Sequence, residues 1–354
     1  MSNFVIVYYA LLIAASCLAA YFKKREIFIL VFTLTLVSFF MGIIGGQSAL
    51  RFITTAAGLL AVAAGMSYAF REFLILITPE GVAKELRTAP LTAAFGMFVI
   101  CTYAIAGIFA PIIAPFGEAQ VISSAFAPAD ETMLLGADQL GRDMFSRIIY
   151  GARNTVGLAL LATMLAFIMG ALAGLLAATK GGWFDQFLGR FADVIMSIPS
   201  LIFALLMLSI FGTNLIVIVI VIAVIYSPRV FRLTRAVAGN VVVMDYIEAA
   251  KLRGEGTWYL IRKEILPNST APLIAEFGLE FCFVFLLIAG LSFLGLGVQP
   301  PTADWGSMVR ENATLISFGE LTPLIPAAAI ALLTVAVNFV VDWMLFRSSG
   351  LKEM

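Results

Sequence analysis

The sequence predicts an all-α, polytopic membrane protein. Of its 354 residues, 62% are hydrophobic and 12% are charged, and the mean hydropathy is +1.03. A soluble domain carries about twice that charged fraction. A membrane-spanning helix needs about 20 mostly apolar residues, and nine segments are candidates. They lie at approximately 3–21, 27–46, 52–70, 90–114, 155–179, 199–212, 214–231, 271–296 and 323–346.

The composition also excludes several kinds of site. The chain has no histidine, which removes the commonest general base and metal ligand. Cys17, Cys101 and Cys282 lie far apart in apolar runs, so no metal site and no disulfide framework is predicted. The net charge is zero and no GxxxxGK[ST] phosphate loop occurs. We therefore expect no nucleic-acid partner, no bound cofactor and no catalysis by this chain.

Residues 1–80 and 81–354 are expected to be two domains. The first holds about three additional N-terminal transmembrane helices, rich in alanine and glycine and without any motif. Its first span has no positive side chain ahead of it, so we do not expect a cleavable signal peptide. The stretch 78–90 is polar and is predicted to be a linker between the two domains.

Segment 116–154 contains the run LLGADQLGRDMFSRIIYGAR. Its glycines predict a tight turn that leads into a helix. Asp143 and Arg147 stand four residues apart, which is the spacing of a supporting ion pair on one helix face.

The segment after span 155–179 is polar enough to be a short cytoplasmic helix, and two interpretations remain open: an interfacial amphipathic helix, or a brace under the 244–267 loop. Asp185 and Asp193 flank Arg190 there, and Pro199 suits the first turn of the next span. The following apolar run is broken at 212–214, which predicts two short spans joined by a tight turn.

Span 271–296 carries Glu276 and Glu280 on one helix face. Carboxylates inside a membrane are costly and normally face a bundle interior or a watery path. Two interpretations remain open: they pair with basic side chains or with a partner subunit, or they line a translocation path suited to a cationic solute. The span ends in the glycine-rich run 290–297, and Trp305 beyond it suits the membrane–water interface.

Residues 244–267 form the longest polar interruption of the C-terminal half. Asp245 and Glu248 have capping-box spacing, so a helix is predicted to begin there. Gly254 is expected to end this helix in a left-handed turn. A second helix, at about 256–265, should close at Pro267. The first helix is expected to present one face made of Tyr246, Ala249, Ala250 and Arg253.

The distribution of Lys and Arg predicts the orientation. With nine spans and the 244–267 loop in the cytoplasm, the inside segments hold 17 of these residues and the outside segments hold 5. Positive residues accumulate on the cytoplasmic side. We therefore expect an outside N-terminus and a cytoplasmic C-terminus.

Three stretches carry a resemblance to one family. The 244–267 loop resembles the EAA loop of ABC importer permeases, and segment 116–154 and run 290–297 resemble two further signatures of its dipeptide, oligopeptide and nickel branch. The similarity covers about 88–350. In the EAA loop it rests on Glu248, Ala249, Ala250, Gly254, Ile265, Leu266 and Pro267. In the periplasmic signature it rests on Gly136, Asp138, Gly141, Arg142 and Asp143.

The sequence departs from the family pattern at four places. Ala137 replaces the usual Thr, and Glu264 stands where a His is common. Glu276 and Glu280 stand where the family more often has an amide and a small residue. We expect the change at Glu264 to alter which ATPase fits rather than to abolish coupling.

The resemblance implies a six-span type I importer core, to which the three N-terminal helices are added. It implies a multi-pass protein of the bacterial inner membrane. The expected partners are a second permease subunit, two ATP-binding subunits and a periplasmic solute-binding protein. ATP and Mg would be used by the partner subunits, and the EAA loop would transmit their closure. Peptide is the expected solute class, while nickel chelates, opines and oligosaccharides remain open.

Two alternatives come from other classes. An ion-coupled secondary transporter would use Glu276, Glu280 and Asp342 as ion sites, and it predicts inverted repeats that the sequence does not display. A membrane scaffold would use the N-terminal helices for docking. Neither alternative explains the loop between Glu248 and Pro267.

Overall fold

The computed structural model describes residues 48–318 and 322–348, and this part of the chain is helical throughout, apart from its loops. The predicted spans 3–21 and 27–46 lie outside the described residues. The elements are α3 (Ser48–Ile77), α4 (Glu80–Leu86), α5 (Leu91–Ile108), α6 (Ala110–Ile113), α7 (Met144–Gly151), η1 (Ala152–Val156), α8 (Gly157–Lys180), α9 (Gly182–Met196), α10 (Ser200–Phe211), α11 (Leu215–Val242), α12 (Asp245–Leu252), α13 (Thr257–Tyr259), η2 (Leu260–Ile265), α14 (Leu266–Phe293), α15 (Trp305–Asn312), η3 (Ala313–Phe318) and α16 (Leu324–Ser348).

The chain divides into two compact units, one ending at Phe98 and one beginning at Val99. In the first unit, α4 occupies residues Glu80–Leu86 of the stretch 78–90 that is predicted to be a polar linker. Within that unit, the guanidinium of Arg71 donates to the carbonyl of Ala89 at 3.2 Å. The predicted domain boundary after residue 80 stays a prediction.

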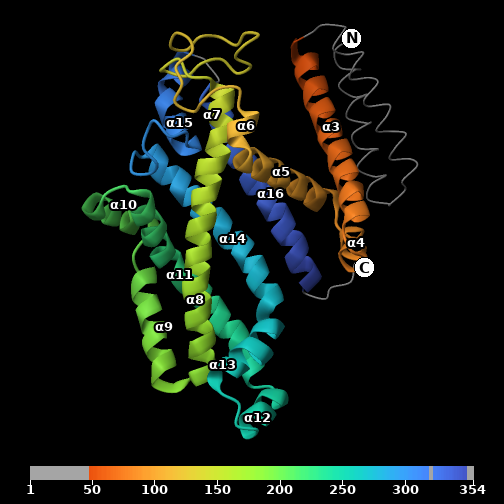
Figure 1. The fold of residues 1–354 in the computed structure, drawn as a ribbon, viewed down its shortest axis with the longest axis vertical. Helices are drawn as coiled ribbons and strands as arrows, with labels where there is room; N and C mark the ends of the chain where they lie inside the picture. The colour runs from red at the N-terminus through yellow and green to blue at the C-terminus, as the bar shows by residue number, and fades with distance from the viewer. Residues whose placement is uncertain (1–47, 319–321, 349–354) are drawn as a thin grey trace. The chain divides into compact units, whose positions relative to one another are not determined.

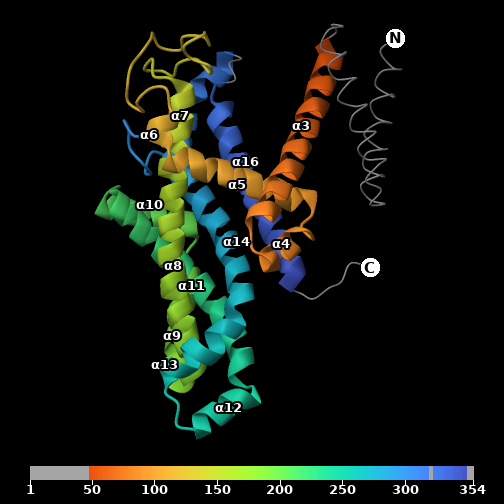
Figure 2. The same ribbon diagram turned by 45° about the vertical axis from the view of Figure 1, so that its right-hand side comes forward.

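The second unit is built around α8, α11, α14 and α16. These helices run lengthwise beside one another in Figures 1 and 2. Ile218, Ile222 and Phe285 are fully buried among them. The loop that precedes α7 and the short helix α15 lie at one end of this unit, and α12 lies at the opposite end (Figure 1). The two polar segments expected on opposite sides of a membrane are thus at opposite ends.

Close packing of α8 on α11 depends on two glycines spaced four residues apart. A Cβ added to Gly170 would lie 2.4 Å from the carbonyl oxygen of Ser227, and one added to Gly174 would lie 2.8 Å from that of Phe231. Small residues at this spacing let the backbones of two membrane helices approach each other. The two helices therefore meet backbone to backbone along this face.

Six helices of the described residues are long and apolar enough to cross a membrane. They correspond to six of the predicted spans, at 52–70, 90–114, 155–179, 214–231, 271–296 and 323–346. The remaining described prediction, a separate span at 199–212, is wrong as stated. The helix α10 has 12 residues, so it is about 18 Å long and too short for a hydrocarbon core of about 30 Å.

Instead, α9 and α10 form one pair that is bent by 85°. The predicted short helix is present as α9, which has 15 residues and packs along α8 and α11. Its outer side is apolar, with Trp183, Phe187 and Phe191 more than half exposed. Asp185 pairs with Arg235 of α11 rather than with Arg190. The expected turn at 212–214 is present between α10 and α11.

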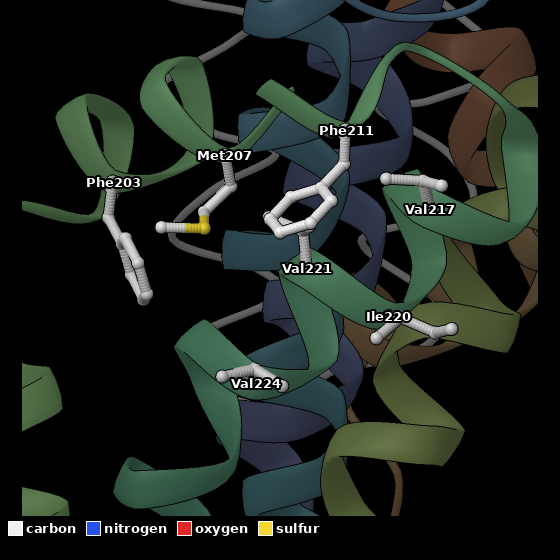
Figure 3. A pocket seen from close by; sticks show the side chains of 7 residues that line it. All are labelled: Phe203, Met207, Phe211, Val217, Ile220, Val221 and Val224. Atoms are coloured by element: carbon white, nitrogen blue, oxygen red, sulfur yellow. The ribbon is translucent and has the colours of Figure 1, made fainter. Parts of the chain in front are cut away.

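An apolar groove of about 340 Å³ lies where α10 turns into α11 (Figure 3). The side chains that line it are Phe203, Met207, Phe211, Val217, Ile220, Val221 and Val224. None of them carries a hydrogen-bonding group suited to a polar solute, so the groove offers no polar transport site.

Candidate functional site: the α12 segment, the charged cap and an intramembrane polar cluster

The helix α12 begins one residue earlier than a capping box of Asp245 and Glu248 would require. Its N-cap is Met244, and no side chain caps the first turn. Asp245 and Glu248 lie within that turn, where their charges favour the positive end of the helix dipole. The predicted helix is present, and the predicted capping box is wrong because Asp245 is already helical.

The two alanines of α12 lie on different faces. Ala250 and Ile247 are fully buried and pack with Leu260 and Ile265 of this same chain. Ala249 is exposed. The expected joint face of Ala249 and Ala250 is therefore not formed, because Ala250 belongs to the contact that fastens α12 to its own chain.

The outer surface of α12 is left without a partner among the described residues. Leu252 is 84% exposed and Val243, just before the helix, is 79% exposed. Tyr246, Glu248 and Ala249 are also exposed. A short helix is thus held by its inner face and offers a mixed apolar and polar outer face.

Gly254 ends α12 in the left-handed conformation that the sequence predicts, with φ +85°. Its N–H donates to the carbonyl of Lys251 at 2.9 Å, and the N–H of Glu255 donates to that of Ala250 at 3.2 Å. These two bonds form a Schellman motif. A Cβ at Gly254 would meet nothing within 4 Å, so only the backbone conformation requires glycine there.

The second helix does not close at Pro267. Instead, α13, the π-helical turn η2 and α14 form one continuous helix from Thr257 to Phe293. Proline is tolerated in the first turn of α14 because the preceding π-helical turn changes the backbone bonding. Ile265 is buried, whereas Leu266 and Pro267 are exposed. Glu264 is half-buried, and its carbonyl oxygen accepts from Asn268.

At the other end of the unit, two glycines shape the loop before α7. Gly136 and Gly141 have φ of +72° and +76°. A Cβ at Gly136 would lie 2.7 Å from the carbonyl oxygen of Ala127, and Gly141 packs even more closely on Ser123. Both the conformation and the lack of space therefore require glycine. Ala137, which replaces a threonine of the family, is buried here.

A buried charge network fastens this loop to α15. Arg142 Nε lies 2.7 Å from Asp138 Oδ2, and Arg142 Nη2 lies 2.9 Å from Glu311 Oε2. Arg147 approaches the same two carboxylates at 3.3 and 3.4 Å. Two positive and two negative charges thus compensate one another. The predicted pair between Asp143 and Arg147 is wrong, because Arg147 turns toward Asp138 and Glu311.

Asp143 instead caps α7. Its carboxylate accepts from the N–H of Ser146 at 2.8 Å and from the Ser146 hydroxyl. Asp304 does the same for α15, where it accepts from the N–H of Ser307 and from the hydroxyl of Thr155. Burial raises the pKa of Asp304 above its ordinary value, although these hydrogen bonds oppose the shift.

Trp305 is fully buried rather than interfacial, which corrects the expectation from sequence. Its indole N–H donates to the carbonyl of Ile148 at 3.0 Å, and its ring lies 5.2 Å from that of Tyr103. A Cβ at Gly151 would lie only 2.3 Å from the indole. The glycine of α7 therefore makes the space that the tryptophan fills.

Glu276 and Glu280 lie on the side of α14 that faces α11. Glu280 is 2% exposed, and its Oε2 has no hydrogen-bond partner in the described part of the chain. Glu276 is half-buried. Arg229 of α11 is close enough to interact electrostatically with both. The structure thus brings Arg229, Glu276 and Glu280 together.

Sequence reasoning missed Glu311 and Arg229. Glu311 stands 164 residues beyond Arg147, so no local spacing connects them. In the sequence, Arg229 contributes only to the excess of positive charge predicted for the cytoplasmic side. A usable signal existed for the glycines of α8, because Gly170 and Gly174 form a GxxxG pattern in an apolar helix.

Comparison with known proteins agrees with this architecture. A sequence model of the binding-protein-dependent transport system inner membrane component family matches residues 166–348. The di/tripeptide transport system permease protein DppC of Pseudomonas aeruginosa is 35% identical over 254 residues, which are 70% of this chain and 84% of that protein. The dipeptide transport system permease protein DppC of Alkalihalophilus pseudofirmus is 33% identical over 261 residues, 73% of this chain and 85% of that protein.

A solved structure of the MetNI methionine ABC transporter in inward facing conformations aligns with a TM-score of 0.49 and 16% identity. It covers 58% of this chain and 97% of that chain.

The fold, the family match and the relatives in sequence define a class, the membrane-embedded permease subunits of ABC importers. The chain belongs to the family of binding-protein-dependent transport system inner membrane components. The predicted fold class, an all-α polytopic permease, is thereby confirmed.

Proposed function

We propose that this chain is the transducing membrane subunit of an ATP-driven peptide importer of the inner membrane. It would pair with a second permease chain, two ATP-binding subunits and a periplasmic binding protein. Its N-terminus would lie outside and its C-terminus in the cytoplasm. The names of its relatives support peptide as the solute class. ATP and Mg would be bound by the ATP-binding subunits, and this chain would carry out no chemical step.

The exposed outer face of α12 is the observation that supports a role in coupling to ATP hydrolysis. Its inner face is anchored through Ile247 and Ala250, while Leu252 and Val243 remain largely exposed. Exposed apolar side chains on a polar segment mark an interaction site. The segment is also the one whose residues match the EAA loop, from Glu248 to Pro267. We assign the docking of an ATP-binding subunit to this outer face.

The test compares two glycines of the same loop. In Gly254→Val the left-handed turn is lost at a cost of about 1–2 kcal/mol, so α12 should be misplaced without unfolding of the membrane helices. Binding-protein-stimulated ATPase activity of the reconstituted complex should fall at least tenfold. Gly256→Val is the matched control, because Gly256 has φ −78° and equally open surroundings. It should retain stimulation.

A second comparison concerns the two alanines. Ala249→Glu should leave the protein folded and abolish stimulation, because Ala249 is exposed. Ala250→Glu should destabilise the protein itself, because the new carboxylate would be buried. Normal stimulation in both Gly254→Val and Ala249→Glu would refute the coupling role of α12.

A further inference from the structure

A polar cluster lies between two helices of the membrane bundle, and the packing described so far does not use it. We define it as Tyr226 and Arg229 of α11 with Glu276 and Glu280 of α14. The two helices pack against each other and run side by side in Figures 1 and 2.

Arg229 is held by aromatic rings. Its guanidinium carbon lies 5.5 Å from the ring centre of Tyr226 and 5.0 Å from that of Phe283. The Tyr226 hydroxyl donates to the backbone carbonyl of Phe283 at 3.2 Å, which fixes the Tyr226 ring. None of the ion pairs found among the described residues involves Arg229. Its charge is therefore positioned and remains available.

Glu280 presents the opposite charge in a buried position. Only 2% of the residue is exposed, and its Oε2 accepts no hydrogen bond from the described residues. It interacts electrostatically with Tyr226 and Arg229, so it faces the cluster. Glu276 is one turn earlier on the same side and is half-buried. A buried carboxylate oxygen without a donor is costly, and an ammonium group from outside the chain would supply that donor.

The combination of two carboxylates with one guanidinium restricts the class of ligand that can bind. A simple cation would be attracted by two carboxylates but repelled by Arg229. A simple anion would be attracted by Arg229 but repelled by the two carboxylates. A zwitterion satisfies both sides, because its ammonium group can donate to Glu280 while its carboxylate accepts from the guanidinium, whose planar donors suit a carboxylate.

We propose that Arg229, Glu276 and Glu280 form an intramembrane site that recognises a short zwitterionic solute, such as an unblocked peptide, during passage. This inference rests on the proposed importer function and specifies the solute class. The ammonium end binds at α14 and the carboxylate end binds at α11. The permease thereby selects the solute a second time, after the binding protein has released it.

The experiment uses the complete complex in liposomes, with its binding protein and a hydrolysate of short peptides of which half has been N-acetylated. Peptides taken up are quantified by mass spectrometry, and ATP hydrolysis is measured in parallel. In Glu280→Gln and in Arg229→Gln, uptake of unblocked peptides per ATP hydrolysed should fall at least tenfold. ATPase stimulation should stay within twofold of the unsubstituted complex. The same binding protein serves every variant, so the change reports on this chain.

Asp342→Asn is the matched control, because it removes a carboxylate of the apolar helix α16 outside the cluster. It should leave uptake per ATP unchanged.

If Glu280→Gln does not fold, Glu276→Gln and Arg229→Gln test the proposal in its place, because both residues are less buried than Glu280. Unchanged uptake per ATP in the cluster variants overturns the proposal. An equal loss of uptake and of ATPase activity, with lower thermal stability, also overturns it and indicates a structural role. Absence of ATP-dependent uptake in the unsubstituted complex would instead refute the importer function.

Discussion

Single residues decide the structure of the cap, which is formed by the loop before α7 and by α15. Arg142 and Arg147 are each no more than 2% exposed, and both are compensated by Asp138 and Glu311. A buried charge whose partner is removed costs far more than a surface ion pair contributes. The cap is thus stable only while all four charges are present.

Glu311→Ala should lower the free energy of unfolding by about 3–5 kcal/mol, because two buried guanidinium groups would share one carboxylate. Glu131→Ala is the control, since Glu131 is exposed in the loop before α7. Its effect should stay within about 0.5 kcal/mol. Thermal unfolding of the purified protein, followed by size-exclusion chromatography, measures both. Equal melting temperatures would show that the network contributes nothing.

Asp304 gives the cap a dependence on pH. Its pKa is raised by burial, so the folded state holds this proton more tightly than the unfolded chain does. The stability that follows is fully present below the ordinary aspartate pKa of about 3.9 and is lost as pH rises through the raised pKa. In Asp304→Asn this component should be absent. Melting curves recorded at increasing pH for both proteins test the prediction, and parallel pH profiles would contradict it.

At the scale of elements, sequence patterns located the long helices but not their ends. Apolar length identifies a span, so six predicted spans coincide with observed helices. Apolar length cannot separate a span from a bent pair, so it predicts a crossing at α10 where the structure has a bend. Likewise, Pro267 predicts a helix end, because the π-helical turn η2 that accommodates it leaves no sequence pattern.

The contact between α8 and α11 makes a second element-scale prediction. Gly170→Ala would place a Cβ 2.4 Å from a backbone carbonyl of α11, so the helices must move apart. We expect a loss of about 1–3 kcal/mol from overpacking. Gly157→Ala on the same helix is the control, because its Cβ would meet nothing within 4 Å. Equal stability of the two variants, measured by thermal unfolding, would refute the close contact.

At the scale of the whole molecule, the charge distribution predicts which end faces the cytoplasm. Cysteine labelling in a background without Cys17, Cys101 and Cys282 tests it. Lys251→Cys should react only with reagents added to the cytoplasmic side, and Ala129→Cys only from outside. Both positions are exposed, so access does not limit the reaction. Labelling of both from one side would reverse or break the proposed topology.

Much of the candidate site was predictable because its motifs are local. Gly254, Gly136 and Gly141 were expected at turns, and all three have positive φ. What local patterns could not provide were contacts between distant segments. Such contacts form only when the helices are assembled. They include Arg147 with Glu311, Trp305 with Gly151, and Arg229 with the two glutamates.

One continuous helix joins the two ends of the bundle. From Thr257, just after α12, to Phe293, beside the cap, it contains 37 residues and is therefore about 55 Å long. A rod of that length acts as a lever arm: a tilt of about 5° at the end near α12 displaces its far end by about 5 Å. A movement of α12 that tilts this helix would thus shift the opposite end of the bundle, and the π-helical turn η2 and Pro272 are the places where the helix can bend.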